Sequence, residues 1–281
     1  MRRSPLYLWR NILSFCLVIT LLLTALLTLP ACANPEEDQP EVYTYPLHAG
    51  GVPEDPQDPD ATPKLRVAIT FDDGPHTIYT KQIVNELDRY GFTATFFIIG
   101  NRADGSKYTK NNVLSFIANK GHEIAIHGYT HDVYYHNCEE ETYQYELSQT
   151  ASVITNQVPD CEIKLMRPIG GNITAERAAA CPYSVVLWSV DSEDWKYKYK
   201  YKSDHSEGDT EEERKQKVDT IVENVMSTVK DGSIILMHDI YESTYDATCI
   251  ILARLHEEGY EVVSVSELLG DPQPGVTYRQ K

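Results

Sequence analysis

LRVAITFDDGPH, residues 65–76, is a short apolar run that ends in two adjacent carboxylates and a turn. Its β-branched and aromatic residues have the length of a buried strand, and Gly74-Pro75 stops that strand at once. Because side chains alternate across a strand, Asp72 and Asp73 cannot face the same way without a local bend. Two like charges side by side are costly without a cation, so the pair predicts a cationic partner elsewhere in the chain. A solvated surface turn is the alternative for this stretch taken alone.

Apolar runs of strand length alternate with helical patterns after this stretch. Nearly continuous apolar strands joined by helices predict an α/β fold with a parallel sheet. About seven strands fit either a barrel slightly smaller than the eight-stranded form or an open doubly wound sheet, and in both the functional groups lie at the carboxyl ends of the strands. We expect strands over 65–71, 93–100, 123–127, 163–166, 184–190, 233–237 and 261–264, and helices over 77–90, 113–118, 139–157, 213–229 and 246–259.

The first 33 residues have the pattern of an export signal. Three arginines and no acid precede an apolar run over 12–29, which small residues follow. Residues 29–32, Leu-Pro-Ala-Cys, resemble a bacterial lipobox, which predicts Cys32 as the lipidated residue of a membrane-anchored protein. Ordinary secretion and an uncleaved membrane anchor remain alternatives. We expect an exported protein, on the outer side of the cytoplasmic membrane if it is anchored there by the lipid.

Composition bounds the rest of the chain. Residues 34–63, rich in Pro, Glu, Asp and Gln, predict a flexible tether. One sizeable core is expected for a chain of 281 residues with 42% hydrophobic content, over about 64–270, with a short C-terminal tail over 271–281. The net charge of −17 argues against nucleic acid as a partner. No protein partner can be inferred.

Two further features of the domain leave alternatives open. Its four cysteines contain no Cys-x-x-Cys spacing, so a thiolate metal site is not expected, while disulfides and free thiols both remain possible. Residues 197–202, Tyr-Lys-Tyr-Lys-Tyr-Lys, predict an exposed hairpin or loop, which could instead grip a sugar chain or an anionic polymer. The cysteines are Cys138, Cys161, Cys181 and Cys249.

Two histidines and a cation follow later strands. His127 and His131 are four residues apart, a spacing that places both on one face of a helical turn. With a strand-end aspartate nearby they supply two nitrogens and one oxygen, the three-ligand set of a catalytic zinc with open positions. Arg167 follows the fourth strand and is the cation that the aspartate pair predicts. An incidental histidine pair and a core arginine are the alternatives.

A second pair of ionisable residues follows the last strands. His238 ends the sixth strand and is a candidate general acid, and Asp194 could orient and charge it. A buried histidine and a surface acidic turn are the alternatives. All these residues fall at strand ends, which lie at one face of the fold. It is improbable that each of them has only its structural explanation, so we expect one shared site.

Five ordered motifs resemble those of the polysaccharide deacetylases, the NodB-homology family or carbohydrate esterase family 4. The resemblance spans about residues 64–269, nearly all of the chain after the tether. It implies a deformed (β/α) barrel of about seven strands that removes N- or O-acetyl groups from sugars with the help of a metal. The motifs are Thr70–Gly74, His127-x-x-x-His131, Arg167-Pro168, Asp191-x-x-Asp194-Trp195 and Leu236-x-His238.

The resemblance also implies a role for each matching residue. Asp73, His127 and His131 would bind one divalent metal ion, usually zinc, with cobalt or another divalent ion as alternatives. Asp72 would be the base for the water molecule on the metal, and Arg167 would position it.

The remaining roles concern the leaving group and the acetyl group. An amide near Gly170 would stabilise the oxyanion, and His238, held by Asp194, would protonate the leaving amine or alkoxide. Leu236 and Trp195 would form the wall around the acetyl methyl.

Two positions depart from the family pattern. Gly128 stands where the family often has Ser or Thr, so a hydroxyl contact beside the metal ligands is expected to be absent. Ile169 replaces the second proline of the third motif, which bears on the rigidity of that loop and on the identity of the oxyanion amide.

The substrate follows from the expected export and from the motifs together. We expect a deacetylase of N-acetylated amino sugars, with peptidoglycan next to the membrane as the substrate. Chitin oligomers, another N-acetylated envelope polysaccharide and acetylated xylan are alternatives within the same chemistry. A non-catalytic sugar-binding protein is the alternative of another class, and it predicts losses among the motif residues that this sequence does not have.

Overall fold

A computed structural model describes residues 64–203 and 207–281, which belong to one compact unit. The expected export signal over 1–33, with Cys32, and the expected tether over 34–63 lie outside the described residues. Within the two described ranges, no helix combines the length and the apolar character needed to cross a membrane.

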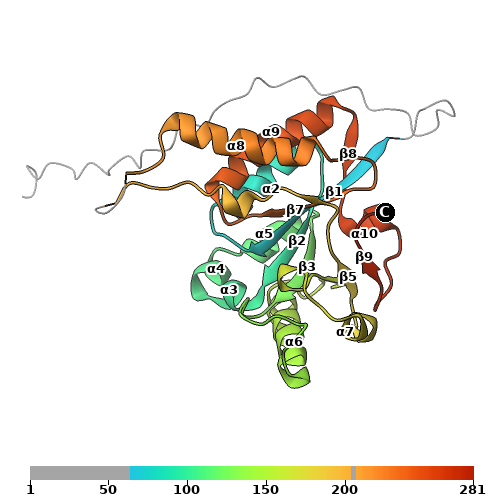
Figure 1. Ribbon diagram of the computed structural model, residues 1–281. Coiled ribbons are helices and arrows are strands. Elements are labelled where there is room, and N and C mark those ends of the chain that lie inside the picture. The colour runs from blue at the N-terminus through green and yellow to red at the C-terminus, as the bar shows by residue number, and fades with distance from the viewer. Residues whose placement is uncertain (1–63, 204–206) are drawn as a thin grey trace, which may run out of the picture. The chain divides into compact units, whose positions relative to one another are not determined.

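A single parallel sheet organises the domain, as the alternating pattern predicts (Figure 1). Eight strands follow the order β6-β7-β1-β2-β3-β4-β5-β9, and β8 pairs with the first half of β1. All of these strand pairs are parallel. The strands are β1 (Leu65–Gly74), β2 (Thr95–Ile99), β3 (Glu123–Gly128), β4 (Leu165–Met166), β5 (Ser184–Val186), β6 (Val190–Asp191), β7 (Ile234–His238), β8 (Tyr260–Val262) and β9 (Thr277–Tyr278).

The sheet curls into a barrel because β5 and β6 lie near opposite ends of the strand order but are almost consecutive in the chain. Only three residues separate Val186 from Val190, and a chain that short spans at most about 14 Å. We predicted one strand over 184–190, and this prediction was wrong. The N–H of Leu187 still bonds to Tyr278 of β9, whereas the N–H of Ser189 bonds to Ile234 of β7, so the chain changes its neighbouring strand between them. The open doubly wound alternative is excluded by this curl.

The C-terminal segment completes the sheet. β9 pairs with β5, and Gln280 forms an antiparallel bridge with Ser233 at the start of β7. The residues that the sequence analysis placed in a tail thus contribute the ninth strand, where about seven were expected.

Helices cover the outside of the barrel (Figure 1). In Figure 1, α2, α8 and α9 lie together above the strands, and α6 and α7 lie below them. The short α3, α4, α7 and α10 were not predicted, since helices of five or six residues carry too little periodicity. The helices are α2 (Tyr79–Arg89), α3 (Gly100–Asp104), α4 (Ser106–Lys110), α5 (Val113–Asn119), α6 (Glu140–Gln157), α7 (Ala175–Ala180), α8 (Glu211–Met226), α9 (Glu242–Glu257) and α10 (Val265–Leu269), with the 3₁₀ turns η1 (Ile169–Gly171) and η2 (Asp194–Lys196).

Two cores share the strands by alternation. One face of each central strand packs under the helices, as Ile69, Phe96 and Ile235 do. The other face fills the barrel interior with a smaller cluster that includes Ala68, Phe97, Ala125, Leu165 and Ile234. Since successive side chains of a strand point to opposite faces, the interior positions recur at every second residue.

Candidate active site

The interior rows of the strands lead directly to the predicted site residues. Counting on in steps of two from Ala68 reaches Thr70 and Asp72, and from Ala125 it reaches His127. The same step takes Leu165 to Arg167 and Ile234 to Leu236 and His238. In the register of β1 with β7, Asp72 pairs with His238. The period of the strands therefore brings these side chains together at the carboxyl end of the barrel.

The two aspartates at the end of β1 are separated by a bend, as the sequence predicts. Asp73 has φ 68°, and the pairing of β1 with β2 shifts register between Phe71 and Gly74. Asp72 keeps the interior direction and contacts Arg167, while Asp73 faces the two histidines. The bend lets adjacent carboxylates serve two different partners.

Arg167 is the predicted cation for this pair, and its side chain is fully buried. Its Nη1 donates to Asp72 Oδ1 at 2.7 Å and to Thr70 Oγ1 at 2.7 Å. Its Nε and Nη2 donate to the carbonyl oxygens of Val186 and Leu187 at 3.1 and 3.2 Å. This set of acceptors holds the guanidinium in one orientation, so the position of the Asp72 carboxylate is fixed as well.

Asp73, His127 and His131 come together in an arrangement that can hold a metal ion. Their three candidate ligand atoms lie within 4.8 Å of one another. Asp73 Oδ1 lies 3.4 Å from His127 Nε2 and 2.9 Å from His131 Nε2. That oxygen is buried and accepts no well-directed hydrogen bond among the described residues. An oxygen and two ring nitrogens that face one another in this way fit a divalent cation.

The backbone places the two histidines differently from our prediction. His127 belongs to β3, and His131 lies in the loop after it with φ 66°, so the expected helical turn is wrong. His127 Nδ1 lies 2.8 Å from the carbonyl oxygen of Arg167. A proton on Nδ1 that is donated to this carbonyl leaves Nε2 free to bind a metal.

The electrostatics of this cluster favour the ligand form of Asp73. Burial alone would favour the neutral acid, but His127 and His131 outweigh burial and hold the pKa of Asp73 well below its usual range. His131 is affected in the opposite direction, since its contact with Asp73 raises its pKa against burial. Asp73 is therefore an ionised, negatively charged group between two imidazoles.

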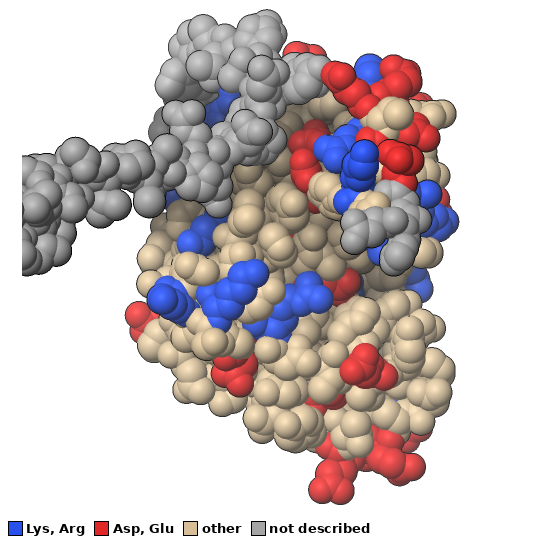
Figure 2. Space-filling view, turned by 90° about the vertical axis from the view of Figure 1, so that its left-hand side faces the viewer, with Lys and Arg blue, Asp and Glu red and all other residues tan. Residues whose placement is uncertain are grey.

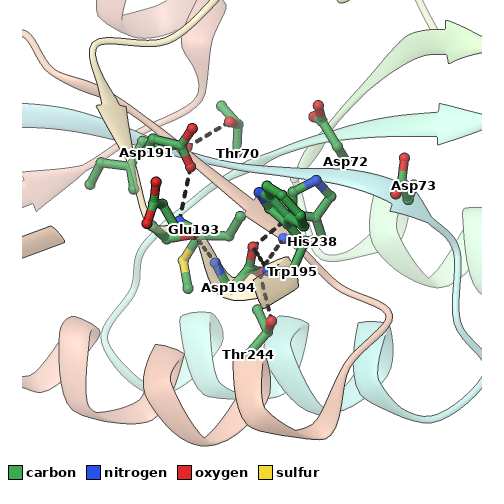
Figure 3. Close-up of polar contacts among 12 residues, drawn as sticks. Thr70, Asp72, Asp73, Asp191, Glu193, Asp194, Trp195, His238 and Thr244 are labelled. Carbon is green, nitrogen blue, oxygen red and sulfur yellow. Dashed lines mark hydrogen bonds and ion pairs between the residues drawn. The ribbon is translucent and has the colours of Figure 1, made fainter. Parts of the chain in front are cut away.

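His238 and Asp194 form the other half of the site, as Figure 3 shows. Asp194 is fully buried, and its Oδ1 lies 2.7 Å from His238 Nδ1. Its Oδ2 accepts hydrogen bonds from the His238 backbone N–H at 2.8 Å and from Thr244 Oγ1 at 2.6 Å. Burial opposes the charge on His238, but Asp194 outweighs it and raises the pKa of His238 to about 9. The imidazole is therefore a proton donor at neutral pH, with Nε2 as its remaining nitrogen.

The loop after β4 carries the predicted oxyanion amide. Gly170 has φ 60°, a left-handed conformation that glycine adopts without strain. Its N–H has no hydrogen-bond acceptor among the described residues, whereas the next amide, that of Gly171, bonds to Pro168. Ile169, which departs from the family pattern, is buried. The Gly170 amide is thus available to a ligand.

The two residues expected to form a wall around an acetyl methyl differ in exposure. Leu236 is buried in β7, one step inward from His238. Trp195, in η2 directly after Asp194, is 48% exposed. Leu236 can therefore limit the depth of the site, and Trp195 presents an open aromatic face at its mouth.

Glu146 is a residue that the sequence analysis missed. It is buried on α6, and its carboxylate accepts hydrogen bonds from the N–H groups of Tyr129 and Thr130 at 2.6 and 2.9 Å and from the Thr130 hydroxyl at 2.7 Å. These donors lie in the loop between His127 and His131. A glutamate inside an amphipathic helical pattern gave no signal beyond its position on the apolar side.

The environment of Gly128 explains the first departure from the family pattern. A Cβ atom on Gly128 would lie 2.6 Å from the Tyr135 hydroxyl oxygen and 3.2 Å from Glu146 Oε2, and φ is 112°. A serine here would require the Tyr135 side chain to shift, and Glu146 from α6 provides the polar contact to this loop.

Asp239 is a second missed residue, directly after His238. It is fully buried, and burial raises its pKa to about 7. Its Oδ2 accepts a hydrogen bond from Thr80, whose hydroxyl in turn accepts from the His76 N–H. Asp239 therefore holds the turn after β1 against the start of α2.

Two features of the domain do not join the site. The cysteines, whose pairing the sequence left open, are all free: Cys138, Cys161, Cys181 and Cys249. A cavity of about 580 Å³ lies at the amino end of β3, beside His122 and Cys161. Because catalytic groups of such barrels gather at the carboxyl ends of the strands, we do not assign the site to this cavity.

Comparison with known proteins identifies relatives of the domain. The family model described as "Polysaccharide deacetylase" matches residues 60–186. The peptidoglycan-N-acetylmuramic acid deacetylase PdaC of Bacillus subtilis is 32% identical over 214 residues, which are 76% of this chain and 41% of PdaC. A peptidoglycan-N-acetylglucosamine deacetylase of Bacillus cereus is 34% identical over 211 residues, 72% of this chain and 87% of that protein.

A solved structure agrees with the barrel. The family 4 acetyl xylan esterase of Clostridium thermocellum, in complex with a cobalt ion, superposes with a TM-score of 0.64 at 25% identity, over 76% of this chain and 98% of that one. This chain spans less than half the length of PdaC. Motifs, fold and relatives agree, and the chain belongs to the polysaccharide deacetylase family.

Proposed function

We propose that this protein is a metal-dependent hydrolase that removes N-acetyl groups from the amino sugars of peptidoglycan. The observation that carries the proposal is the pairing of Asp72 with His238 across β1 and β7, beside the three-ligand cluster of Asp73, His127 and His131. A base and an acid on either side of one reacting carbon are what amide hydrolysis requires.

The three-ligand cluster would hold a divalent cation, with zinc as our first choice. A cation bound there would supply Lewis acidity to the acetyl carbonyl and lower the pKa of a water molecule. Two nitrogens and one carboxylate oxygen leave positions open for both. The cobalt ion in the related acetyl xylan esterase supports a divalent metal at this kind of site.

Asp72 takes the proton from the attacking water in this proposal. Its Oδ1 is held by Arg167 at 2.7 Å, and its Oδ2 lies 3.6 Å from His127 Nε2, next to the metal ligands. The carboxylate is thus fixed beside the position where water would attack. The negative charge that develops on the acetyl oxygen would be stabilised by the Gly170 N–H, which has no acceptor among the described residues.

His238 gives a proton to the leaving amine. Its pKa of about 9 keeps the imidazole charged at neutral pH, and Asp194 holds Nδ1 so that Nε2 carries the mobile proton. Once that proton has moved, the C–N bond breaks and acetate and a free amino sugar leave.

The substrate assignment rests on the relatives and on the expected location. PdaC and the Bacillus cereus relative are both named as peptidoglycan deacetylases. An export signal over residues 1–33, with Cys32 as the lipidated residue, would place the domain on a tether outside the cytoplasmic membrane, where peptidoglycan lies. The export signal and the lipid anchor are part of this proposal.

Acetate release from defined polymers tests the function. The purified protein is stripped of metal with a chelator, reloaded with zinc or cobalt, and assayed on peptidoglycan, chitin oligomers and acetylated xylan. We expect release from peptidoglycan that depends on the added metal and produces one free amine per acetate. Release from xylan alone would contradict the N-acetyl assignment, and no release from any polymer by metal-loaded protein would contradict the enzyme.

A further inference from the structure

The Tyr-Lys segment over 197–202 has a defined arrangement next to the site. The hydroxyls of Tyr199 and Tyr201 donate to Asp246 and Glu242 on α9, and the guanidinium of Arg214 lies over both rings, 4.8 and 5.3 Å from their centroids. The tyrosines are thus anchored to α8 and α9. The lysines that alternate with them are exposed, so the segment presents positive charge outward.

Lys198 is the lysine of this segment that points toward the site. Its Nζ lies 5.0 Å from the ring centroid of Tyr241, and that ring lies 6.3 Å from the imidazole of His238. No carboxylate of the described residues lies within ion-pair distance of Lys198, whereas Lys196 pairs with Glu193 at 2.5 Å. Lys198 is therefore a cation without an ion pair, next to the half of the site that His238 and Asp194 form.

Arg102 is a second cation without an ion pair among the described residues, from a different part of the chain. It lies in α3, which directly follows the carboxyl end of β2, between β1 with Asp73 and β3 with His127. Its side chain is partly buried but has neither an ion pair nor a hydrogen bond among the described residues. Lys107 on α4 is exposed and also has no ion pair among the described residues.

The backbone brings α3 close to the site, because the N–H of Asn101, the residue before Arg102, donates to the carbonyl oxygen of Tyr129 at 2.9 Å, between His127 and His131. Burial lowers the pKa of His76, in the turn after β1, and Lys107 and Arg102 lower it further. Burial raises the pKa of Tyr241 to about 12, and Arg102 acts against that rise. Lys198 lies over the ring of this same tyrosine.

Positive side chains gather on one face of this acidic protein (Figure 2). The chain has 42 acidic residues against 25 lysines and arginines. Figure 2 looks onto the side where α3 and α4 lie in Figure 1, and a row of Lys and Arg side chains crosses the middle of that face. A partly buried arginine without a partner is costly, so an external anion would stabilise it.

We propose that Arg102 and Lys198 bind a carboxylate on the polysaccharide, close to the sugar that is deacetylated. This proposal rests on the proposed function and adds a substrate class: chains that carry carboxylates are preferred over neutral chains of the same N-acetyl sugar. Exposed Trp195 lies beside this region and offers a face for the sugar ring. Together these residues recognise an anionic amino-sugar polymer.

The test compares three substrates with the full metal-loaded protein. They are neutral N-acetylglucosamine oligomers, peptidoglycan strands, and the same strands after their carboxylates have been amidated with a carbodiimide and an amine. The variants are Arg102→Gln, Lys198→Gln, the double variant and the conservative Arg102→Lys. Lys120→Gln is the matched control, because it removes one positive charge at the other end of the barrel.

We expect the ratio of kcat/KM on native strands to that on amidated strands to fall roughly tenfold for each single Gln variant, mainly through KM. Arg102→Lys should keep most of the ratio, and Lys120→Gln all of it. Rising salt should lower the ratio for the wild-type protein. Metal content, measured for every variant, should not change.

Two outcomes would overturn the proposal. The first is a wild-type protein that deacetylates native and amidated strands equally well. The second is a pair of Gln variants whose ratio stays at the wild-type value, or whose losses on neutral oligomers equal those on native strands. Both leave the deacetylase assignment intact, since that assignment fails only if metal-loaded wild-type protein releases no acetate.

Discussion

The two halves of the site have opposite charges arranged in the same way. On the base side, the anionic Asp72 is held by the fully buried cation Arg167. On the acid side, the cationic His238 is held by the fully buried anion Asp194. In each half the group that we propose to exchange protons, Asp72 or His238, is less deeply buried than its partner, Arg167 or Asp194.

The halves differ in where the buried charge comes from. Arg167 follows β4 and is tied to the backbone of the β5 end through Val186 and Leu187, so it belongs to the barrel interior. Asp194 lies in a 3₁₀ turn and is tied to Thr244 on α9, outside the barrel. The base side is therefore coupled to the stability of the fold more closely than the acid side.

Replacing Asp72 with Asn should have the largest effect on activity. The amide keeps the shape of the side chain but cannot accept the proton of the attacking water, so kcat should fall by roughly 10²–10⁴-fold. Acetate release gives the rate, and bound metal is measured in parallel. Asp88→Asn, the same change at an exposed position on α2, should leave the rate unchanged. Full activity in Asp72→Asn would contradict the proposal that Asp72 is the base.

Arg167→Met should have the largest effect on stability. It removes one partner of a fully buried ion pair and leaves Asp72 without a counter-charge, so the free energy of unfolding should fall by about 3–5 kcal/mol. Urea denaturation followed by circular dichroism measures the change. Arg254→Met is the control, because Arg254 forms only an exposed pair with Glu258, and its cost should stay under about 1 kcal/mol. Equal costs for both would show that the base side is not coupled to the fold.

Glu146→Gln tests how the loop between His127 and His131 is held in place. Gln lacks the charge and one of the two acceptor oxygens that hold the loop between His127 and His131, the two histidines of the proposed metal site, so metal affinity should fall by roughly 10–100-fold. Competition with a chromophoric chelator measures that affinity. Glu141→Gln on the same helix is exposed and should bind metal as the wild-type protein does. An unchanged affinity in Glu146→Gln would mean that the loop is held without Glu146.

Gly128→Ser should have the smallest effect. Restoring the common family residue should lower the free energy of unfolding by about 1–3 kcal/mol, because its Cβ would meet the Tyr135 hydroxyl. Gly121→Ser separates the cost of a positive φ from the cost of the steric contact. The φ of Gly121 is also positive, at 80°, but nothing lies within 4 Å of an added Cβ. The excess cost of Gly128→Ser should shrink when Tyr135→Phe is added, and no excess cost at all would contradict the steric explanation.

Much of this site could be predicted because strand periodicity and strand ends are local properties. The need of Asp72 and Asp73 for a cation predicted Arg167, and the bend between them followed from side-chain alternation. The alternation along β1 and β7 likewise places Asp72 and His238 on one interior row.

Other features depend on contacts that the sequence does not record. The split of 184–190 into β5 and β6 comes from hydrogen bonds with Tyr278 and Ile234, distant in sequence. Glu146 serves a loop 16 and 17 residues away, and its helix pattern does not distinguish it from other glutamates. The approach of His127 to His131 was predicted for a wrong reason, since a strand and a left-handed residue replace the helical turn.

The pH dependence of acetate release tests most directly whether the site consists of a base half with Asp72 and a separate acid half with His238. If His238 donates the proton as proposed, kcat/KM of the wild-type protein should hold up to near its pKa of about 9 and fall above it. In Asp194→Asn the buried negative charge is gone while burial still opposes the imidazolium, so the pKa of His238 should drop and the alkaline limb should move to lower pH by more than about one unit. The acidic limb, which belongs to the base side, should stay in place. An alkaline limb that does not move, or two limbs that move together, would contradict the assignment of Asp194 and His238 as a separate acid half.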